Sequence, residues 1–318
     1  MNSLIIPVYG NAGSMPELLQ QLRDLSQRLT SPLEVVFVVD ASPDDSFAIL
    51  KRELPQQPFA SQLLAHSRNF GSFAGIRSGL AVAQGSRFAV MAADLQEPIE
   101  LAESFFVKLA NDEADVLVGT RDGRADPLGS RIASSLFWGF YRRFVVRNVP
   151  PGGVDVFACN DVFRRHLLDL DESHSSLIGL IFWLGFRRAV VPYTRLARRH
   201  GQSGWNFSRK LRYMTDSIFA FTDLPIRLLM AVGMLGLAAS TVLGLVVLVL
   251  RLASNIAVPG YTATMIAILF FGGLNALGLG IVGAYVWRAY ANTQRRPQSV
   301  VMSRQQFAAA TAQQGNEP

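Results

Sequence analysis

The sequence predicts an α/β protein with a mostly parallel sheet, followed by a hairpin of two membrane-spanning helices. The first 120 residues alternate short apolar runs with segments whose apolar residues recur at helical spacing. This alternation is typical of a parallel sheet covered by helices. The last third holds two uncharged stretches of 23 and 27 residues, Leu228–Leu250 and Tyr261–Trp287. Both exceed the ~20 apolar residues that a helix needs to cross a bilayer core.

The expected strands and helices follow one another in regular alternation. The strands are 3–9, 34–39, 63–66, 88–92 and 115–119, and the helices are 16–29, 45–54, 74–84 and 98–110. Gly75 and Gly79 in the third helix are expected to allow close packing. Ligands of such sheets bind beyond the carboxyl ends of the strands. The polar residues expected at those ends are Tyr9, Asp40, Arg68, Asp94 and Arg121.

Two common phosphate-binding patterns are missing from the sequence. No GxGxxG follows the first strand, and GxxxxGK[ST] does not occur. These patterns supply the backbone cradle for phosphates in nicotinamide-binding and P-loop proteins. Phosphates bound by this protein would therefore be held by a metal ion or by arginines.

Composition excludes several classes of protein. Of the 318 residues, 50% are hydrophobic and 17% are charged, which excludes disorder and a collagen-like chain. The one cysteine, Cys159, cannot form an internal disulfide, and the four histidines form no Cys/His cluster for structural zinc.

The charge is distributed unevenly along the chain. Residues 1–120 carry 8 Lys/Arg and 14 Asp/Glu, whereas residues 121–318 carry 22 and 10. A basic part suits nucleic acid, or a phosphorylated substrate beside an anionic membrane. Because the basic residues gather beside the apolar stretches and in candidate phosphate sites, we expect no nucleic acid partner.

Positive charges flank the two apolar stretches on the side of the termini. They are Arg209, Lys210, Arg212 and Arg227 before the first stretch and Arg288, Arg295 and Arg296 after the second, while the loop between them keeps only Arg251. The positive-inside rule then places the N-terminal domain and both termini in the cytoplasm. The N-terminus starts as a strand without a basic segment, so no signal peptide is expected. Buried core helices are the alternative for the two stretches.

Four regions are expected along the chain. Residues 1–207 form the cytoplasmic α/β domain, and residues 208–226 form an amphipathic helix in the membrane interface. An ordinary surface helix is the alternative for this second region. Residues 227–290 hold the two membrane helices, about 228–250 and 261–287. Residues 291–318, rich in Gln and Ala, form a disordered cytoplasmic tail.

Three segments at the ends of expected strands carry a family resemblance. They are Pro7-Val8-Tyr9, Val39-Asp40-Ala41-Ser42-Pro43-Asp44 and Ala93-Asp94-Leu95-Gln96-Glu97-Pro98. With the apolar hairpin they resemble the inverting glycosyltransferases of family 2, which have the GT-A fold. The resemblance is strongest to the polyisoprenyl-phosphate glycosyltransferases, such as dolichol-phosphate mannosyltransferase and bactoprenol glucosyltransferase. It covers residues 3 to about 290.

The resemblance implies both a fold and an activity. The fold is a GT-A catalytic domain, which is Rossmann-like with a mostly parallel sheet. The activity is inverting transfer of one hexosyl unit from a nucleotide-diphosphate sugar, either a UDP-sugar or GDP-mannose, to a polyprenyl phosphate. The acceptor would be undecaprenyl or dolichyl phosphate, reached at the cytoplasmic face of the cell inner membrane.

A metal site is expected after the fourth strand. Asp94 and Gln96 place two oxygen ligands at one strand end. Mg²⁺ or Mn²⁺ commonly takes only one or two protein ligands when it bridges phosphate oxygens. The family's Asp-x-Asp-x-Gln motif falls here, with Ala92 in place of the first Asp. The alternative is that Asp94 caps a helix beginning at Leu95.

The resemblance also assigns residues to the donor nucleotide. They are Pro7, Val8, Tyr9, Asp40, Arg68 and Asp94. Asp40 matches the second Asp of the family's Asp-Asp-Gly-Ser pattern, in which Val39 and Ala41 replace the first Asp and the Gly. Asp44 is either a turn residue or a further nucleotide contact.

Arginines are expected at both phosphate groups, because their planar fork donates paired hydrogen bonds to phosphate. Asp155 matches a family Asp and is expected to position acceptor or sugar hydroxyls. The resemblance implies that Arg121, Arg131, Ser134 and Ser135 form the lipid-phosphate set, and that the loop over the diphosphate holds Arg198, Arg199 and Ser203. The catalytic set is then Asp94, Asp155, Arg121 and Arg198. A solvated basic helix face is the alternative around Arg131.

Two other functions compete with lipid-linked transfer. A processive polysaccharide synthase needs a Gln-x-x-Arg-Trp motif, which the sequence lacks. A non-catalytic sugar-nucleotide-binding scaffold or sensor is favoured by Ala92 and by Gly204, which stands where the family often has Lys. The interfacial helix and the hairpin could also support a homo-oligomer.

Overall fold

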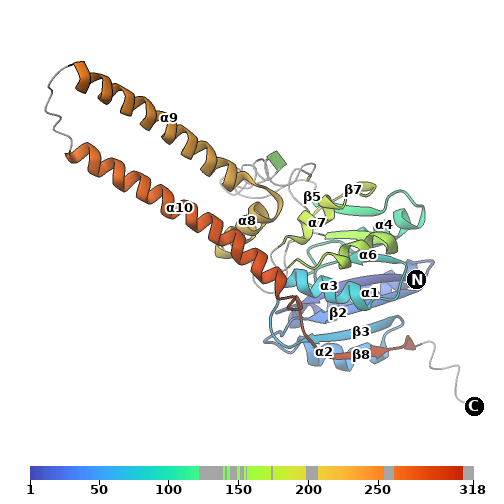
Figure 1. Cartoon of the computed structure of the whole chain (residues 1–318). Helices are drawn as coiled ribbons and strands as arrows, with labels where there is room; N and C mark the ends of the chain where they lie inside the picture. The colour runs from blue at the N-terminus through green and yellow to red at the C-terminus, as the bar shows by residue number, and fades with distance from the viewer. Residues whose placement is uncertain are drawn as a thin grey trace, which may run out of the picture. The chain divides into compact units, whose positions relative to one another are not determined.

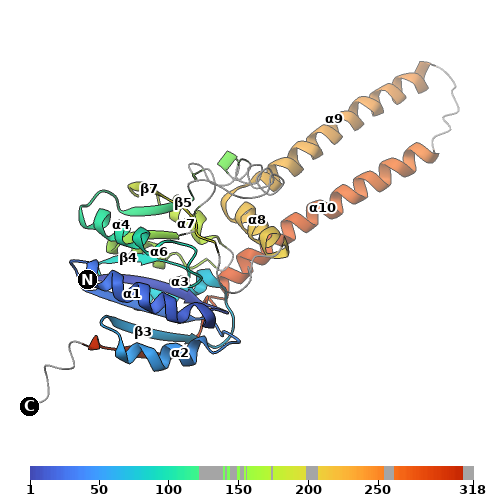
Figure 2. The same ribbon diagram turned by 180° about the vertical axis from the view of Figure 1, so that it is seen from behind.

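The computed structural model describes residues 1–121, 139, 142–143, 149–150, 154, 156–172, 175–197, 207–253 and 261–310. Its contacts divide the chain into two compact units, drawn in Figures 1 and 2. The first unit contains Met1–Glu172, Ser176–Lys210 and Pro297–Pro318, and the second contains Ser173–Ser175 and Leu211–Arg296. Each unit is described by itself.

The first unit is built on an eight-stranded sheet with the order β7-β5-β6-β4-β1-β2-β3-β8. Its strands are β1 Asn2–Val8, β2 Leu33–Val39, β3 Ala60–His66, β4 Arg87–Val90, β5 Val116–Arg121, β6 Val156–Asn160, β7 Arg188–Tyr193 and β8 Val301–Phe307. Neighbours among β1 to β4 pair in parallel, as do β5 and β7, whereas β6 and β8 pair antiparallel. The mostly parallel sheet predicted from the sequence is therefore confirmed.

Helices cover both faces of this sheet. They are α1 Met15–Arg28, α2 Ser46–Glu53, α3 Ser72–Val82, α4 Ile99–Ala110, α6 Asp161–Asp169 and α7 Leu177–Trp183. α1 contacts α2 and α4, while α3 contacts α6, so the two groups form the outer layers (Figures 1 and 2). Strands β1 and β2 are buried on both faces, which explains their continuous apolar runs.

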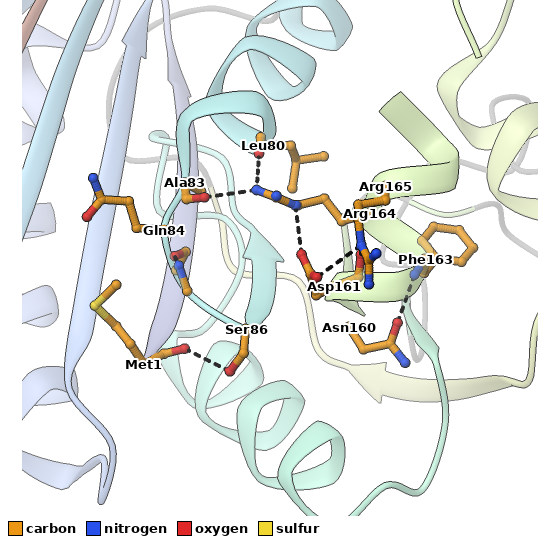
Figure 3. Close-up of polar contacts among 12 residues, drawn as sticks. Met1, Leu80, Ala83, Gln84, Ser86, Asn160, Asp161, Phe163, Arg164 and Arg165 are labelled. Atoms are coloured by element: carbon orange, nitrogen blue, oxygen red, sulfur yellow. Dashed lines mark hydrogen bonds and ion pairs between the residues drawn. The ribbon is translucent and has the colours of Figure 1, made fainter. Parts of the chain in front are cut away.

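Helices α3 and α6 each contribute one arginine that donates to carbonyl groups at the C-terminal end of the other helix. Arg77 of α3 donates to the carbonyls of Leu167 and Leu168, at 2.8 and 3.1 Å. Arg164 of α6 donates from Nη1 to two carbonyls at the end of α3, at 2.9 and 2.8 Å (Figure 3). Because the last carbonyls of a helix lack partners within it, each arginine satisfies and electrostatically stabilises the other helix.

Two glycines of α3 lie over the sheet at different distances. A Cβ at Gly79 would lie 2.5 Å from Cγ2 of Ile5, whereas a Cβ at Gly75 would lie 3.4 Å from Cβ of Pro7. The close-packing role is thus strict at Gly79, and Gly75 makes an ordinary contact.

We expect Gly79→Ala to lower the free energy of unfolding by about 1–3 kcal/mol, because Ile5 must leave its rotamer or the helix must shift. Gly75→Ala, on the same helix, is the matched control and should be neutral or stabilise by up to about 1 kcal/mol through helix propensity. Thermal unfolding of the full chain in detergent compares the two. Equal stability of both variants would contradict this packing.

The prediction of a disordered C-terminal tail is wrong for part of that segment. Residues 291–318 were expected to be disordered, yet 301–307 form β8, paired antiparallel with β3 (Figure 1). Arg304 donates to Oε1 of Gln62 at 3.0 Å, and Ala310 N donates to the carbonyl of Gln57 at 2.9 Å. Phe307 packs against the core. The polar composition of this segment gave no strand pattern. The segment is a strand because it pairs with β3, which lies far away in the sequence.

The second unit contains most of α8 Phe207–Phe221, from Leu211 onward, together with α9 Leu224–Ala253 and α10 Tyr261–Thr293. Near its C-terminal end α10 packs on α8, where the rings of Phe219 and Tyr285 lie 5.0 Å apart. There Arg288 donates to Asp216 at 2.8 Å. The helical state of the interfacial segment and of both apolar stretches is confirmed. α9 runs beyond both expected ends and α10 beyond its expected C-terminal end, whereas α8 ends at Phe221, before the expected end at residue 226.

Within the described part of the chain, one helical stretch, Phe270–Thr293, is long and apolar enough to cross a membrane. Met214–Phe221 and Leu224–Gly236, bent by 76° at their junction, qualify only when counted as a single span. A membrane hairpin and an interfacial location of α8 therefore stay predictions.

Candidate functional site

The candidate site lies at the carboxyl ends of β1, β2, β3 and β4, where four loops turn sharply. Each loop contains one residue with a positive φ: Gly10 at 70°, Ala41 at 50°, Gly71 at 97° and Leu95 at 58°. The left-handed region costs a residue with a Cβ roughly 1–2 kcal/mol. Backbone strain of this kind gathers at functional sites. Ala41 occupies the position where the family pattern has Gly, which fits its backbone conformation.

The order of strands changes direction between β1 and β4. From β1 the chain adds β2 and β3 on one side, whereas β4 lies on the other side. Ligands of open α/β sheets bind at such a switch point. The loops of these two strands are joined there by Ser14, whose hydroxyl donates to the carbonyl of Ala93 at 2.7 Å. The metal motif predicted at Asp94 thus lies at the switch point.

The loops after β1 and β2 are joined by two hydrogen bonds. The N–H of Gly10 donates to the hydroxyl of Ser42 at 2.8 Å, and the N–H of Ala12 donates to Oδ2 of Asp44 at 2.8 Å. Asp44 Oδ1 accepts from the hydroxyls of Ser42 and Ser46, each at 2.6 Å. Burial raises the pKa of Asp44, but these hydrogen bonds outweigh it and hold that pKa below its usual value. Asp44 therefore makes the hydrogen bonds of a turn residue, and its contact with the nucleotide stays a prediction.

The carboxylate of Asp40 joins the β2 and β3 loops from inside the protein. Its residue is 3% exposed. Oδ1 accepts from the N–H of Phe70 at 2.8 Å and contacts Nδ1 of His66 at 2.8 Å, while Oδ2 accepts from the N–H of Gly71 at 2.7 Å. Asp40 therefore holds the loop that carries Arg68. The expected direct contact of Asp40 with nucleotide stays a prediction.

The metal motif is described at Asp94 and Gln96. Asp94 is 9% exposed, and its Oδ1 accepts from the N–H of Gln96 at 3.3 Å. Helix α4 begins at Ile99 with Pro98 as its N-cap residue, so the alternative of Asp94 as the helix cap is wrong. The Asp94 carboxylate at a switch point fits a divalent cation that takes its other ligands from phosphate and water.

Gln96 is tied to the segment after β7. Its Oε1 accepts a hydrogen bond from Nη2 of Arg195, and its carbonyl accepts from the N–H of Leu196 at 2.9 Å. A guanidinium on Oε1 opposes a cation at the same oxygen, so Asp94 is the better-supported ligand of the pair. The contact also brings the metal motif next to the chain that leads into the expected diphosphate loop.

The residues predicted to bind the nucleotide near the end of β1 lie partly in the core and partly on the surface. Val8 is 1% exposed and belongs to the hydrophobic core, so its side chain does not face a ligand. Tyr9 is 49% exposed at the end of β1, available for stacking on a base. Arg68 is exposed, and its guanidinium lies 4.0 Å from the ring centre of Phe70. Pro7 faces α3, below Gly75.

The remaining predicted residues are only partly described. Arg121 ends β5 opposite Tyr193 of β7 in the ladder, which places it at the same edge of the sheet. The other expected acceptor and diphosphate residues lie outside the described residues: Arg131, Ser134, Ser135, Asp155, Arg198, Arg199 and Ser203. The structure therefore brings Tyr9, Asp40, Arg68 and Asp94 to one edge of the sheet and places Val8 in the core, while their contact with the donor stays a prediction.

Sequence reasoning missed two residues of this site, His66 and Arg195. His66 is the last residue of β3, and its place at a strand end was a signal that could have found it. Arg195 stands two residues after β7 and gave no comparable signal. Cys159 has no role here, because it is fully buried and burial raises the pKa of its thiol. Within the described residues there is no cluster of three or more His, Cys, Asp or Glu that could hold a metal.

Comparisons with known proteins agree with this arrangement. The model of the family described as glycosyl transferase family 2 matches residues 3–170. The glycosyltransferase CsbB of Bacillus subtilis (strain 168) is 31% identical over 299 residues, which cover 94% of this chain and 90% of that protein. The bactoprenol glucosyl transferase of Shigella phage SfV is 25% identical, with 96% and 99% covered.

Solved structures that match part of this chain were also found. The mannosyltransferase PcManGT from Pyrobaculum calidifontis, in complex with GDP-Man and Mn²⁺, has a TM-score of 0.45 and 17% identity. The match covers 90% of this chain and 87% of that one.

Proposed function

The chain belongs to glycosyl transferase family 2, and we propose that it moves one hexosyl unit from a nucleotide-diphosphate sugar to a polyprenyl phosphate. The observation that carries the proposal is the position of Asp94, a nearly buried carboxylate at the switch point of the sheet. The named relatives that span most of the chain, bactoprenol glucosyl transferases among them, support the lipid acceptor. We favour a UDP-sugar as donor, with GDP-mannose as the second candidate.

The proposed reaction is a single displacement with inversion. An ionised oxygen of the lipid phosphate attacks C1 of the sugar, a new C1–O bond forms, and the bond from C1 to the nucleoside diphosphate breaks. The leaving diphosphate takes the electron pair, so no proton has to move and no general base is needed. Asp155 then positions sugar or acceptor hydroxyls instead of acting as a base.

The chain's own residues supply the two ends of this displacement. Arg198, Arg199 and Ser203 hold the departing diphosphate, and Arg121, Arg131, Ser134 and Ser135 hold the attacking phosphate. When bound at Asp94, Mg²⁺ or Mn²⁺ neutralises charge that develops on the leaving diphosphate. Arg195 and Leu196 hold Gln96 next to the chain that leads into the expected diphosphate loop.

We also propose that the second unit anchors the enzyme in the cell inner membrane. In the sequence, the uncharged stretches Leu228–Leu250 and Tyr261–Trp287 exceed the ~20 residues that a spanning helix needs, and arginines flank them on the side of the termini. In this topology the α/β domain and both termini are cytoplasmic, and α8 lies in the interface. The anchor would keep the enzyme at the membrane that contains its lipid acceptor.

A transfer assay tests the function. Membranes that contain the full chain are incubated with undecaprenyl phosphate, Mg²⁺ or Mn²⁺, and one radiolabelled UDP- or GDP-sugar at a time. We expect label to enter the organic phase from one donor, and EDTA to abolish it. Nucleotide binding without transfer from any donor would favour the non-catalytic scaffold or sensor. Loss of both binding and transfer in the folded protein would overturn the proposal.

A further inference from the structure

A continuous line of hydrogen bonds runs from the donor side of the site to the C-terminal segment. Nδ1 of His66 lies 2.8 Å from Oδ1 of Asp40, and Nε2 of His66 lies 2.9 Å from the hydroxyl of Ser78 on α3. The hydroxyl of Ser78 lies 2.7 Å from that of Ser299. These four residues come from four segments that the sequence separates by up to 259 positions, and all belong to the first unit.

The chemistry of the groups gives this line a direction. A carboxylate only accepts hydrogen bonds, so Nδ1 of His66 carries the hydrogen and donates to Asp40. When the ring is neutral, Nε2 accepts from the hydroxyl of Ser78, and the oxygen of Ser78 in turn accepts from Ser299. Asp40, His66 and Ser78 are 3%, 1% and 8% exposed, so water does not compete for these bonds.

The line ends at the loop that carries Arg68. Asp40 receives the N–H groups of Phe70 and Gly71 as well as Nδ1 of His66. The ring of His66 also packs edge-on against the ring of Phe70, with centroids 5.5 Å apart. The guanidinium of Arg68 stacks on the same Phe70 ring. His66 thus restrains the β3–α3 loop twice, through Asp40 and through Phe70.

The C-terminal segment is held close to Ser299 by independent contacts. The N–H of Ser67 donates to the carbonyl of Val300 at 3.0 Å, and the side chain of Gln298 donates to the carbonyl of Glu172 at 3.0 Å. β8 then continues along β3 as far as Phe307. Ser299 is therefore held on one side by backbone pairing and on the other by the side chain of Gln298, and its hydroxyl can act as a fixed end for the line.

We propose that His66 is a positioning residue for the sugar-nucleotide donor and that Ser299, in the segment after α10, completes its support. The inference rests on the proposed function, because it assigns the loop around Arg68 to donor binding. His66 touches neither donor nor acceptor. It orients Asp40 and Phe70, so that the loop is ordered before the donor arrives and less binding energy is spent on ordering it.

Two substitutions at His66 separate positioning from simple packing. The amide nitrogen of Asn lies where Nδ1 lies in His, so His66→Asn can still donate to Asp40. The amide nitrogen of Gln lies where Nε2 lies, so His66→Gln keeps only the end at Ser78. Both remove the ring and its contact with Phe70, so the two variants differ in which bond of His66 is kept, the one to Asp40 or the one to Ser78.

Isothermal titration of the full chain in detergent with UDP and with GDP, each with Mg²⁺, measures the effect. We expect His66→Gln to weaken binding of the preferred nucleotide by roughly tenfold or more, as for loss of a hydrogen bond to a charged group. His66→Asn should weaken it clearly less. In the transfer assay His66→Gln should raise KM for the donor far more than it lowers kcat. Equal Kd values for the two variants, or a Kd for His66→Gln equal to that of the unaltered protein, would overturn the assignment.

The C-terminal end of the line is tested in the same way. Ser299→Ala should weaken nucleotide binding several-fold, and a chain ending at Arg296, which lacks Ser299 and β8, should weaken it further. A chain ending at Ala310 removes only residues after β8 and should bind as the full chain does. If the chain ending at Arg296 does not fold, Ser299→Ala still decides the point. Unchanged binding by Ser299→Ala would remove Ser299 from the support.

Nucleotide binding by the unaltered protein distinguishes a failure of the proposed function from a failure of the positioning role of His66. If it binds neither UDP nor GDP, the proposed function fails and the variants carry no information about donor positioning. If it binds one of them and the His66 pair behaves alike, the proposed donor site stands, the transfer assay still tests the reaction, and the positioning role is wrong.

Discussion

Replacing Asp94 by Asn should lower transfer by at least about 10²- to 10³-fold, the range seen when a group that stabilises developing charge is removed. The substitution keeps the shape of the side chain and removes its negative charge. Asp94 lies at the switch point of the sheet and is 9% exposed. Because little water screens this position, the loss of its negative charge has a large effect on charge interactions there. The fall should appear in kcat of the transfer assay, at saturating donor and lipid.

Glu100→Gln is the matched control for this experiment. Glu100 is an exposed carboxylate on α4, and its contact is a surface ion pair with Arg28 at 3.5 Å. Pairs of this type contribute about 0–1 kcal/mol, so activity and stability should hardly change. A folded Asp94→Asn enzyme with more than a tenth of the original kcat would contradict the role of Asp94.

Replacing Asp40 by Ala should lower the free energy of unfolding by about 3–5 kcal/mol, and nucleotide binding should be lost with it. The change leaves the N–H groups of Phe70 and Gly71 and Nδ1 of His66 without their acceptor. Each buried donor left unpaired costs about 1–3 kcal/mol. Chemical unfolding in detergent measures the first effect and isothermal titration the second.

Asp45→Ala is the control for Asp40, five positions along the same loop. Asp45 is exposed, and its side chain makes no capping hydrogen bond to α2. Its removal should change the free energy of unfolding by less than about 1 kcal/mol. If Asp40→Ala were as stable as Asp45→Ala, the carboxylate of Asp40 would not hold the β3–α3 loop in solution.

Much of the first 120 residues follows from local pattern. The expected strands 3–9 and 34–39 correspond to β1 Asn2–Val8 and β2 Leu33–Val39, with ends that agree within one residue. Such strands are buried on both faces, and a run of apolar residues between turn signals is sufficient to identify them. Beyond β5 the pattern weakened. Strand β6, which pairs antiparallel with β4 and β5, was not expected.

The sequence predicted the positions of the residues at the strand ends better than it predicted their contacts. Asp40 and Asp94 were expected at the ends of β2 and β4, where they lie. The burial of Asp40, the turn role of Asp44 and the contact of Arg195 with Gln96 were not visible in the motifs. Which partner a carboxylate or amide takes depends on loops that only the assembled sheet brings together.

The sequence alone was sufficient for the family, the order of strands and helices in the first part, and the two long apolar helices. Each of these depends on residues close together in the chain, through periodicity, strand-end motifs or an uninterrupted apolar stretch. The tertiary structure decided that residues 301–307 form β8 and that Ser299 reaches Ser78 and thereby His66. These contacts join residues more than 200 positions apart, and their stability comes from backbone pairing and burial, which no local pattern encodes.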